Sequence, residues 1–374
     1  MRRIASHLAL LPSGILSRPL ITLRDGEIVA IEQWERLDAM AGVEFYAGIV
    51  VPALVNAHCH LELSYLEGQI ERRGGFAAFA AGVARTRNLF TLEDRIEAAR
   101  SASERMWSEG VAAVGDVAND VLAFEVKEQS PIRYRTFAEV FGLRTASIEA
   151  MEPLLKFGET ALSPHSTYSL QDEIFKRICS EGDAPLSIHF MESPGERELY
   201  EGGGALHEWY KTQGWECDFL HYGSPAERIV ASVPAERSVL LVHNCCVTQR
   251  DIDVIMGHFT APVYWAICLG SNDYISGLMP DVELLRRNGL NICIGTDSLA
   301  SNSSLEMLAE LRRLSDYPLV EVLTWATANG ADALGYGGEL GRIEIGKRCG
   351  LAVIDALDYE KLRLTERSTC RRIV

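Results

Sequence analysis

Two histidines separated by a single residue end an apolar stretch near the start of the chain. His58 and His60 stand in "VPALVNAHCHLEL", and because side chains alternate between the two faces of a β-strand, both imidazoles point to the same side. An isolated His-x-His pair often has no role in chemistry, because one histidine can be exposed while the other is hydrogen bonded in the core. Whether the pair belongs to a site therefore depends on the rest of the chain.

Polar side chains that could take part in chemistry also end four other apolar runs. His165, His189 and His243 each end a run, Glu192 follows His189 by three residues, and Asp297 ends the last run. The cores of parallel barrels are filled by branched apolar side chains. Five of the nine histidines at strand ends therefore indicate a site rather than a packed core.

Imidazole and carboxylate side chains together are typical ligands of zinc or iron(II). We expect His58, His60, His189 and Asp297 to bind one divalent metal, with zinc as the first choice and iron(II) as the second. Such a metal lowers the pKa of bound water towards about 7. Hydrolysis is therefore the indicated reaction class.

Two further side chains are placed to move protons. Glu192 lies beyond His189 and can shuttle a proton between water and a heterocyclic substrate, while His243 can orient or deprotonate the water. A surface position for Glu192 stays open, because the segment "ESPGERE" is charged and contains Pro-Gly.

The elements that must position these residues are short apolar runs alternating with helical stretches. The runs are continuously apolar, which predicts strands buried on both faces, as in a parallel sheet wrapped by helices. Segments 91–110 and 248–259 show the 3.6-residue periodicity of amphipathic helices. Eight runs predict an α/β fold, a (β/α)8 barrel of the TIM type. They are residues 49–58, 111–118, 134–142, 159–166, 185–192, 238–245, 263–272 and 291–298.

In such a barrel the chemistry lies where strands end at the C-terminal face, so the candidate residues should meet there. A buried lysine that could be carboxylated to bridge two metals is absent from the third and fourth runs. One metal is therefore the simpler expectation.

The two ends of the chain differ from the centre in their sequence pattern. Residues 1–50 read as short strands, with a hairpin signal at Asp25-Gly26. The segment 341–374 also returns to short strands and turns. We therefore expect a small composite β-sandwich built from residues 1–50 and 341–374, beside a barrel over residues 51–340.

Composition limits the partners and the location. The chain has 374 residues and a net charge of −16 without a basic stripe, which argues against nucleic acid. Nine cysteines without a C-x-x-C pattern favour a reducing compartment, and we expect the cytoplasm. No stretch reaches the roughly 18 apolar residues of a membrane helix. A small-molecule substrate is expected, and a homo-oligomer stays open.

Taken together, these motifs resemble the amidohydrolase superfamily, and within it the mononuclear deaminase branch. The matching motifs are "NAHCH", "PHSTYS", "HFMES", "VHN", "GSN", "SGLMP" and "GTDSLASN", in the order of the family and over nearly the whole chain. Within the branch, "NAHCHLELS", "FAEVFG" and "GTDSLASNSSLEMLAELR" are most similar to the aminodeoxyfutalosine deaminases of the alternative menaquinone pathway. The S-adenosylhomocysteine and methylthioadenosine deaminases come next.

The resemblance implies a (β/α)8 barrel with a β-sandwich from both chain ends. It also implies hydrolytic deamination of a substituted adenine, 6-aminodeoxyfutalosine-like or another 5′-modified adenosine, with ammonia released through metal-activated hydroxide. The metal ligands carried over are His58, His60, His189 and Asp297. Glu192 and His243 would transfer protons with help from Asp297. His165 would contact the substrate.

Other residues and other functions stay open. Glu62 and Glu139 follow apolar runs and could hydrogen bond a ribose or a ring nitrogen, or could cap helices or face solvent. Ser271-Asn272 and Ser301-Asn302 are explained as well by turn formation as by substrate binding. Segment 65–76 departs from the family pattern and leaves the distal part of the substrate undefined. A guanine, pterin or s-triazine hydrolase would keep the same ligands, whereas a non-catalytic relative would be expected to lack one.

Overall fold

Eight parallel strands form the centre of the molecule. The computed structural model describes residues 1–36 and 41–374, and in them these strands occur as two sheets of four, in the orders β6-β7-β8-β9 and β10-β11-β12-β13. Their bounds are β6 (Leu54–Cys59), β7 (Val111–Ala118), β8 (Arg133–Val140), β9 (Thr160–Pro164), β10 (Leu186–Phe190), β11 (Val239–His243), β12 (Val263–Ile267) and β13 (Asn291–Ile294).

Two parallel bridges join the edges of these sheets into a barrel. Ser166, after β9, pairs with His189 on β10, and Cys59 on β6 pairs with Asp297, after β13. Every residue of β6, β7, β10, β11 and β12 is buried. The continuous apolar runs in the sequence therefore correspond to strands covered on both faces, and the predicted (β/α)8 barrel is confirmed.

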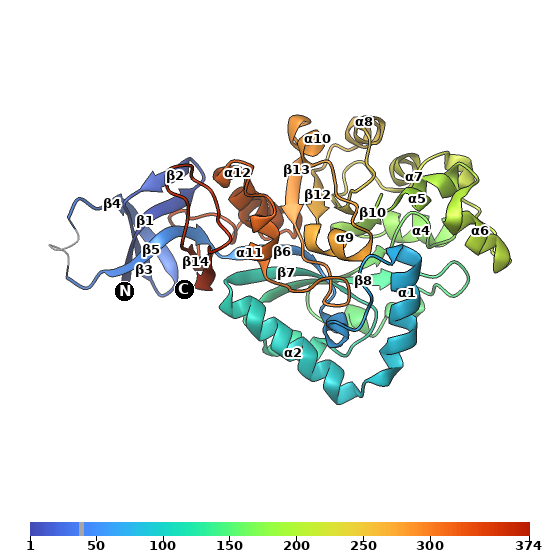
Figure 1. The fold of residues 1–374 in the computed structure, drawn as a ribbon, viewed down its shortest axis with the longest axis horizontal. Helices are drawn as coiled ribbons and strands as arrows, with labels where there is room; N and C mark the ends of the chain where they lie inside the picture. Colours follow the sequence, from blue (N-terminus) through green and yellow to red (C-terminus); the bar gives the residue numbers. More distant parts are fainter. Residues whose placement is uncertain (37–40) are drawn as a thin grey trace.

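Helices lie between successive strands and flank the barrel (Figure 1). The two helices predicted from periodicity are present as α2 and α8, and each begins with a capping box, Thr91 with Asp94 and Thr248 with Asp251. The helices are α1 (Gly75–Thr86), α2 (Leu92–Ser108), α3 (Phe124–Gln129), α4 (Asp172–Ser180), α5 (Pro194–Tyr200), α6 (Gly204–Thr212), α7 (Pro225–Ser232), α8 (Gln249–His258), α9 (Leu269–Ile275), α10 (Val282–Arg287), α11 (Met307–Arg312), α12 (Leu319–Thr324) and α13 (Gly330–Ala333).

Both ends of the chain build one β unit beside the barrel, as the sequence predicts. Its strands are hydrogen bonded into a single sheet of seven, in which β5 lies between β1 and β14, and Figure 1 shows both termini within this unit. The strands are β1 (Arg2–Leu11), β2 (Gly14–Ser17), β3 (Pro19–Arg24), β4 (Glu27–Gln33), β5 (Glu44–Pro52), β14 (Leu351–Ile354) and β15 (Cys370–Arg372). The boundaries at residues 50 and 341 stay a prediction, and residues 37–40 of the first segment lie outside the described residues.

The hairpin predicted at Asp25-Gly26 joins β3 to β4. Arg24 pairs with Glu27 across the turn, and both turn residues have positive φ, 51° for Asp25 and 83° for Gly26. This is the backbone that Asp-Gly favours in a two-residue hairpin.

The first apolar run, residues 49–58, is divided between two strands rather than forming one. β5 ends at Pro52 and β6 begins at Leu54. Between them the Ala53 N–H donates to the Gly350 carbonyl at 3.1 Å, and Pro52 has no N–H with which to continue a ladder. The run therefore passes from the end sheet into the barrel, and only its second half is the first barrel strand.

The cysteines and the helices add two facts about the chain. All nine cysteines are free thiols. Within residues 1–36 and 41–374, none of the helices has both the length and the apolar character that a membrane crossing requires.

The contact between β5 and β14 gives a prediction about stability. A Cβ on Gly48 would lie 2.1 Å from the Ile354 carbonyl oxygen, whereas one on Gly14 would have no atom within 4 Å, and both glycines have positive φ, 123° and 113°. We expect Gly14→Ala to lower the free energy of unfolding by about 1–2 kcal/mol through its backbone alone. Gly48→Ala should lower it by roughly 1–3 kcal/mol more, because the backbone of β14 must move. Urea unfolding of both variants measures these changes in the free energy of unfolding. An equal loss of stability in the two variants would contradict the tight contact at Gly48.

Candidate metal centre and active site

The predicted site residues lie together at the C-terminal ends of the barrel strands. His58 lies on β6, His189 on β10, and His243 ends β11. His60 directly follows β6, and Asp297 follows β13 by three residues. Since parallel strands of a barrel end at one face, residues distant in the sequence become neighbours there.

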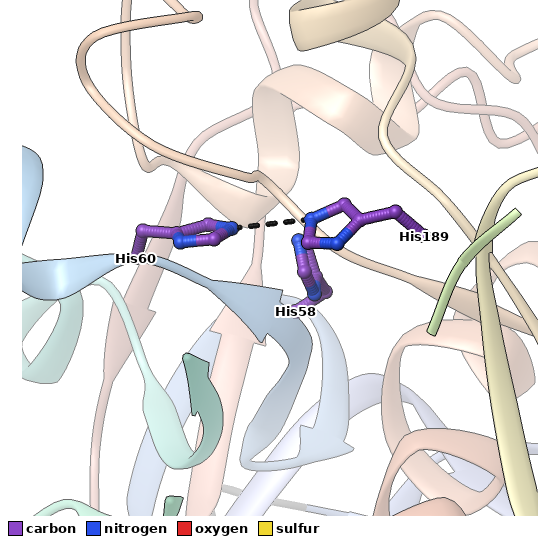
Figure 2. A group of neighbouring side chains, drawn as sticks. All are labelled: His58, His60 and His189. Carbon is purple, nitrogen blue, oxygen red and sulfur yellow. Dashed lines mark hydrogen bonds between the residues drawn. The ribbon is translucent and has the colours of Figure 1, made fainter. Parts of the chain in front are cut away.

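Three of these histidines, His58, His60 and His189, form the group drawn in Figure 2. His60 Nε2 and His189 Nε2 are 3.4 Å apart, and the His58 ring lies against both rings at centroid distances of 5.0 and 4.9 Å. His58 is fully buried, and neither of its ring nitrogens has a hydrogen-bond partner among the described residues. Buried nitrogens without partners are costly unless something binds them. The three-histidine group therefore fits a metal ion.

Burial favours the neutral form of His60 and His189, which is the form that a metal binds. Burial lowers the pKa of His60 to about 3. Burial together with the neighbouring imidazoles lowers the pKa of His189 well below its usual range. His189 Nδ1–H donates to the His165 carbonyl at 2.9 Å, so the lone pair on His189 Nε2 is free and faces His60.

Asp297 stands beside this group with its two oxygens in different roles. Asp297 Oδ1 is 3.4 Å from His60 Nε2 and 3.7 Å from His58 Nε2. Asp297 Oδ2 accepts hydrogen bonds from the hydroxyls of Ser271 at 2.6 Å and Ser301 at 2.8 Å. Burial acts to raise the pKa of Asp297, but the facing imidazoles hold it well below its usual range. We propose this carboxylate as the fourth ligand.

Glu139, His165 and His189 form a second group whose donor atoms lie within 4.8 Å of one another. The rings of His165 and His189 are stacked, with centroids 4.6 Å apart and 28° between the planes. Ring stacking does not separate the two groups, since His60 and His189 are also stacked, with 27° between the planes. His189 Nδ1, however, is already used by the His165 carbonyl, so this group is the poorer metal site.

Glu192 and His243 face each other next to the three-histidine group. Glu192 Oε1 is 3.8 Å from His243 Nε2. His243 Nδ1–H donates to Asn272 Oδ1 at 2.9 Å, which leaves His243 Nε2 as an acceptor. The Glu192 side chain is only 12% exposed, so it is not the surface carboxylate that its sequence context allows, and burial raises its pKa. The pair can hold and transfer a proton at this point.

A cavity of about 620 Å³ opens from these residues towards the surface. Its lining includes the predicted substrate contacts His165, Glu62 and Glu139. Both glutamates are buried rather than solvated, and burial raises the pKa of Glu62 to about 8 and that of Glu139 to about 7. One oxygen of Glu62 accepts the backbone N–H groups of Asn119 at 3.0 Å and Asp120 at 3.2 Å. The cavity has the size of a small-molecule site.

The part of the cavity beyond these polar residues, which we call the outer chamber, has apolar walls. The wall residues are Phe76, Phe79, Val83, Phe141, Leu143, Leu206, Trp209 and Trp215. Trp209 and Phe141 are each 50% exposed. Two arginines also line it: Arg95 is paired with Asp120 at 3.0 Å, whereas Arg87 is exposed and has no ion pair within the described part of the chain.

Sequence reasoning undervalued three polar residues of the site. Ser271 and Asn272 lie on helix α9 rather than in the turn that their sequence indicates. With Ser301 they hold Asp297 and His243 through the hydrogen bonds described above. The available signal was their position, because Ser271 and Asn272 end the seventh apolar run of the predicted barrel and Ser301 follows the eighth.

Comparison with protein families and curated proteins agrees with this geometry. The model of the Amidohydrolase family matches residues 49–372. The chain is 28% identical to an adenosine deaminase of Helicobacter pylori, with 83% of this chain and 79% of that protein covered. It is 28% identical to an aminodeoxyfutalosine deaminase of Nitratiruptor sp., with 95% and 91% covered. It is 26% identical to a 5-methylthioadenosine/S-adenosylhomocysteine deaminase of Halobacterium salinarum, with 91% and 83% covered.

A solved structure shares the complete architecture. It is the Helicobacter pylori aminofutalosine deaminase in complex with methylthio-coformycin. The TM-score is 0.82 at 26% identity, with 98% of this chain and 94% of that chain covered.

The choice between the two donor groups gives a prediction about metal content. We expect His189→Ala to lose most of its metal, because even changes next to a ligand cost roughly 10–100-fold in affinity. His165→Ala is the matched control, since it removes the imidazole stacked on His189 and should keep the metal. Elemental analysis of both proteins after expression with added metal measures this. Loss of metal from the His165 variant would instead favour the group with Glu139.

Proposed function

Since the chain belongs to the amidohydrolase family, we propose that it removes ammonia hydrolytically from a substituted adenine. The proposed substrate is 6-aminodeoxyfutalosine or another adenosine modified at its 5′ position, and the similarity to deaminases of both kinds supports this. The observation that carries the proposal is the pair of Glu192 and His243, 3.8 Å apart beside the three-histidine group. A proton donor and a proton acceptor next to a metal site are what hydrolytic deamination of a ring requires.

One divalent ion is proposed as the cofactor, with zinc as the first choice and iron(II) as the second. It would be held by His58, His60, His189 and Asp297. When bound, such an ion lowers the pKa of water towards about 7 and so supplies hydroxide at neutral pH. Lys127 is buried but is ion-paired with Asp116, so it is no candidate for a bridge between two metals.

His243 is proposed to take the proton of the attacking water. The hydrogen bond to Asn272 fixes the proton on Nδ1, and Nε2 is therefore the basic nitrogen that faces the cavity. Because His243 is buried, its ring is held in one orientation. This places the acceptor before the substrate arrives.

Glu192 is proposed to deliver a proton to the ring nitrogen next to the carbon that bears the amino group. Burial raises the pKa of Glu192, which favours the protonated form that can donate. The oxygen of the attacking water adds to that carbon, and the tetrahedral intermediate then loses ammonia. Asp297 and His243 assist the second step by holding and returning protons.

His165, Glu62 and Glu139 are proposed to contact the substrate. His165 Nδ1 has no hydrogen-bond partner among the described residues, and burial lowers the pKa of His165 to about 4, so the ring is neutral and free to bind. One oxygen of Glu62 holds the Asn119 and Asp120 peptides. Its other oxygen is left for a ribose hydroxyl.

The outer chamber supports a large substituent on the adenosine. Its walls are aromatic and aliphatic, and Arg87 supplies a cation without an ion pair among the described residues. The carboxyphenyl group of 6-aminodeoxyfutalosine matches both features. The acidic residues that line the cavity are Glu62, Glu139, Glu192 and Asp297. They all belong to its histidine end, so among the described lining residues none is left to pair with the ammonium group of S-adenosylhomocysteine.

A hydrolase of guanine, a pterin or an s-triazine is the alternative. It would use the same metal ligands, but an unsubstituted ring would leave the apolar outer chamber unfilled. A non-catalytic relative is less favoured, because every proposed ligand is present. A cytoplasmic location, supported by the nine free cysteines, and a place in menaquinone biosynthesis are proposed with the preferred substrate. A homo-oligomer stays a prediction.

A panel of amino-bearing rings tests the substrate. We expect the metal-loaded protein to release ammonia from 6-aminodeoxyfutalosine or methylthioadenosine and to change the adenine-like ultraviolet spectrum into a hypoxanthine-like one. S-adenosylhomocysteine should react at least about tenfold more slowly, because its ammonium group would be desolvated without a partner. Turnover of guanine, a pterin or a triazine, with every adenine compound untouched, would refute the substrate and leave the metal site standing.

Replacement of Glu192 tests the proton transfer. Glu192→Gln should keep the metal and the fold, because the amide is nearly isosteric, and should lower kcat by roughly 10²–10⁴-fold, the usual worth of a general acid–base group. Glu198→Gln, an exposed glutamate on α5, is the control and should behave as wild type. A Glu192→Gln protein with full activity on the true substrate would show that another group carries the proton.

A further inference from the structure

A second glutamate, four residues after Glu192, is turned inward at the same strand ends. Glu196 lies on α5 and is 1% exposed. Its Oε2 accepts the backbone N–H of Met191 at 2.6 Å, and its Oε1 accepts the hydroxyl of Thr167. The carboxyl therefore joins the segment after β9 to the segment after β10.

The Met191 contact holds a strained turn between two site residues. Met191 follows His189 by two positions and directly precedes Glu192, and its φ of 51° lies in the left-handed region. Its N–H is bound by Glu196, and its carbonyl accepts the N–H of Cys246 at 2.8 Å. Both peptide groups that flank Met191 are thus fixed, which is how an unfavourable backbone conformation is maintained.

The Thr167 contact fixes the neighbouring strand end. Thr167 follows His165 by two positions, and its carbonyl accepts the hydroxyl of Tyr200 at 2.6 Å and the Nη1–H of Arg228 at 2.5 Å. Its hydroxyl has Glu196 as a partner. Side chain and backbone of Thr167 are therefore both tied to groups behind the cavity.

We infer that Glu196 is a positioning residue, whose carboxyl clamps the Met191 peptide to Thr167 and so fixes where Glu192 and His165 stand in the cavity. The inference rests on the proposed function for the role of Glu192 in proton transfer. It adds a residue that touches neither metal nor substrate.

A purely local role in the helix would look different. An acidic residue in the first turn of a helix is stabilising when it lies near the free N–H groups of that helix. Glu196 instead turns both oxygens to the strand ends. Burial raises its pKa to about 8, so the neutral form is favoured at pH 7 and glutamine is a fair mimic. The amide oxygen can accept the Met191 N–H, and the amide nitrogen can donate to Thr167 Oγ1, as a protonated Oε1 would in the neutral form.

Three variants separate positioning from charge. Glu196→Ala removes both contacts and is expected to lower kcat by roughly 10–100-fold, with the KM within about threefold and the metal content unchanged. Glu196→Gln should restore kcat to within about threefold of wild type and leave the pH profile of kcat unmoved. Glu198→Ala makes the same change at an exposed position of the same helix and should have no effect.

Hydrogen exchange followed by mass spectrometry gives a readout that needs no turnover. The segment 186–196 should exchange faster in Glu196→Ala than in wild type and should stay protected in Glu196→Gln and Glu198→Ala. If wild type deaminates none of the adenine compounds, the proposed function fails, while this measurement still tests the clamp.

Two results would overturn the inference. One is a Glu196→Ala protein with wild-type kcat or wild-type exchange. The other is a Glu196→Gln protein as inactive as the alanine variant, because charge rather than position would then be needed. Should Glu196→Ala fail to fold, Thr167→Val replaces it. This nearly isosteric change removes one contact, and we expect kcat to fall by roughly 3–10-fold, whereas an unchanged kcat would overturn the inference.

Discussion

The whole site depends on the contact that closes the barrel between its first and last strands. The His58 carbonyl accepts the backbone N–H groups of Thr296 and Asp297, each at 3.0 Å, next to the bridge between Cys59 and Asp297. His58 and Asp297 are also two of the four proposed metal ligands. The contact that closes the barrel therefore also fixes the distance between the His58 imidazole and the Asp297 carboxylate. Separation of these two strand ends would therefore also disrupt the proposed site.

The chain stabilises a buried polar centre by giving the proposed ligands fixed hydrogen-bond partners. His189 is held by a carbonyl, and Asp297 by two hydroxyls. Positive φ angles at non-glycine residues occur where these strands end, at Met191, His243, Asn244 and Asp297. Such conformations cost of order 1–3 kcal/mol each and persist only where the surroundings impose them. The backbone strain lies in the turns that orient the proposed site residues, and the contacts of the surrounding barrel maintain it.

The sequence predicted the barrel because its strands are covered on both faces and so read as continuous apolar runs. The histidines could be assigned to a site because imidazoles at strand ends have no packing reason to be there. The supporting residues were harder to recognise. Asn272 follows a strand in a sequence typical of a turn but lies on a helix, and Glu196 stands in a charged segment yet is buried. Their partners are distant in sequence, and periodicity carries no information about such contacts.

The outer chamber has a consequence for how this protein could change over time. Its walls come from α1, from the segment after β8 and from the region of α6, and none of these lies on a barrel strand. Gly202 and Gly203 precede α6 and Gly204 begins it, and Gly202 and Gly204 have positive φ, so this wall is attached through backbone that few other residues could adopt. Under the proposed function, variation in these segments would alter which substituent is accepted while leaving the proposed metal ligands in place. Substitutions in these segments would therefore change substrate selectivity without replacing the residues proposed for the reaction.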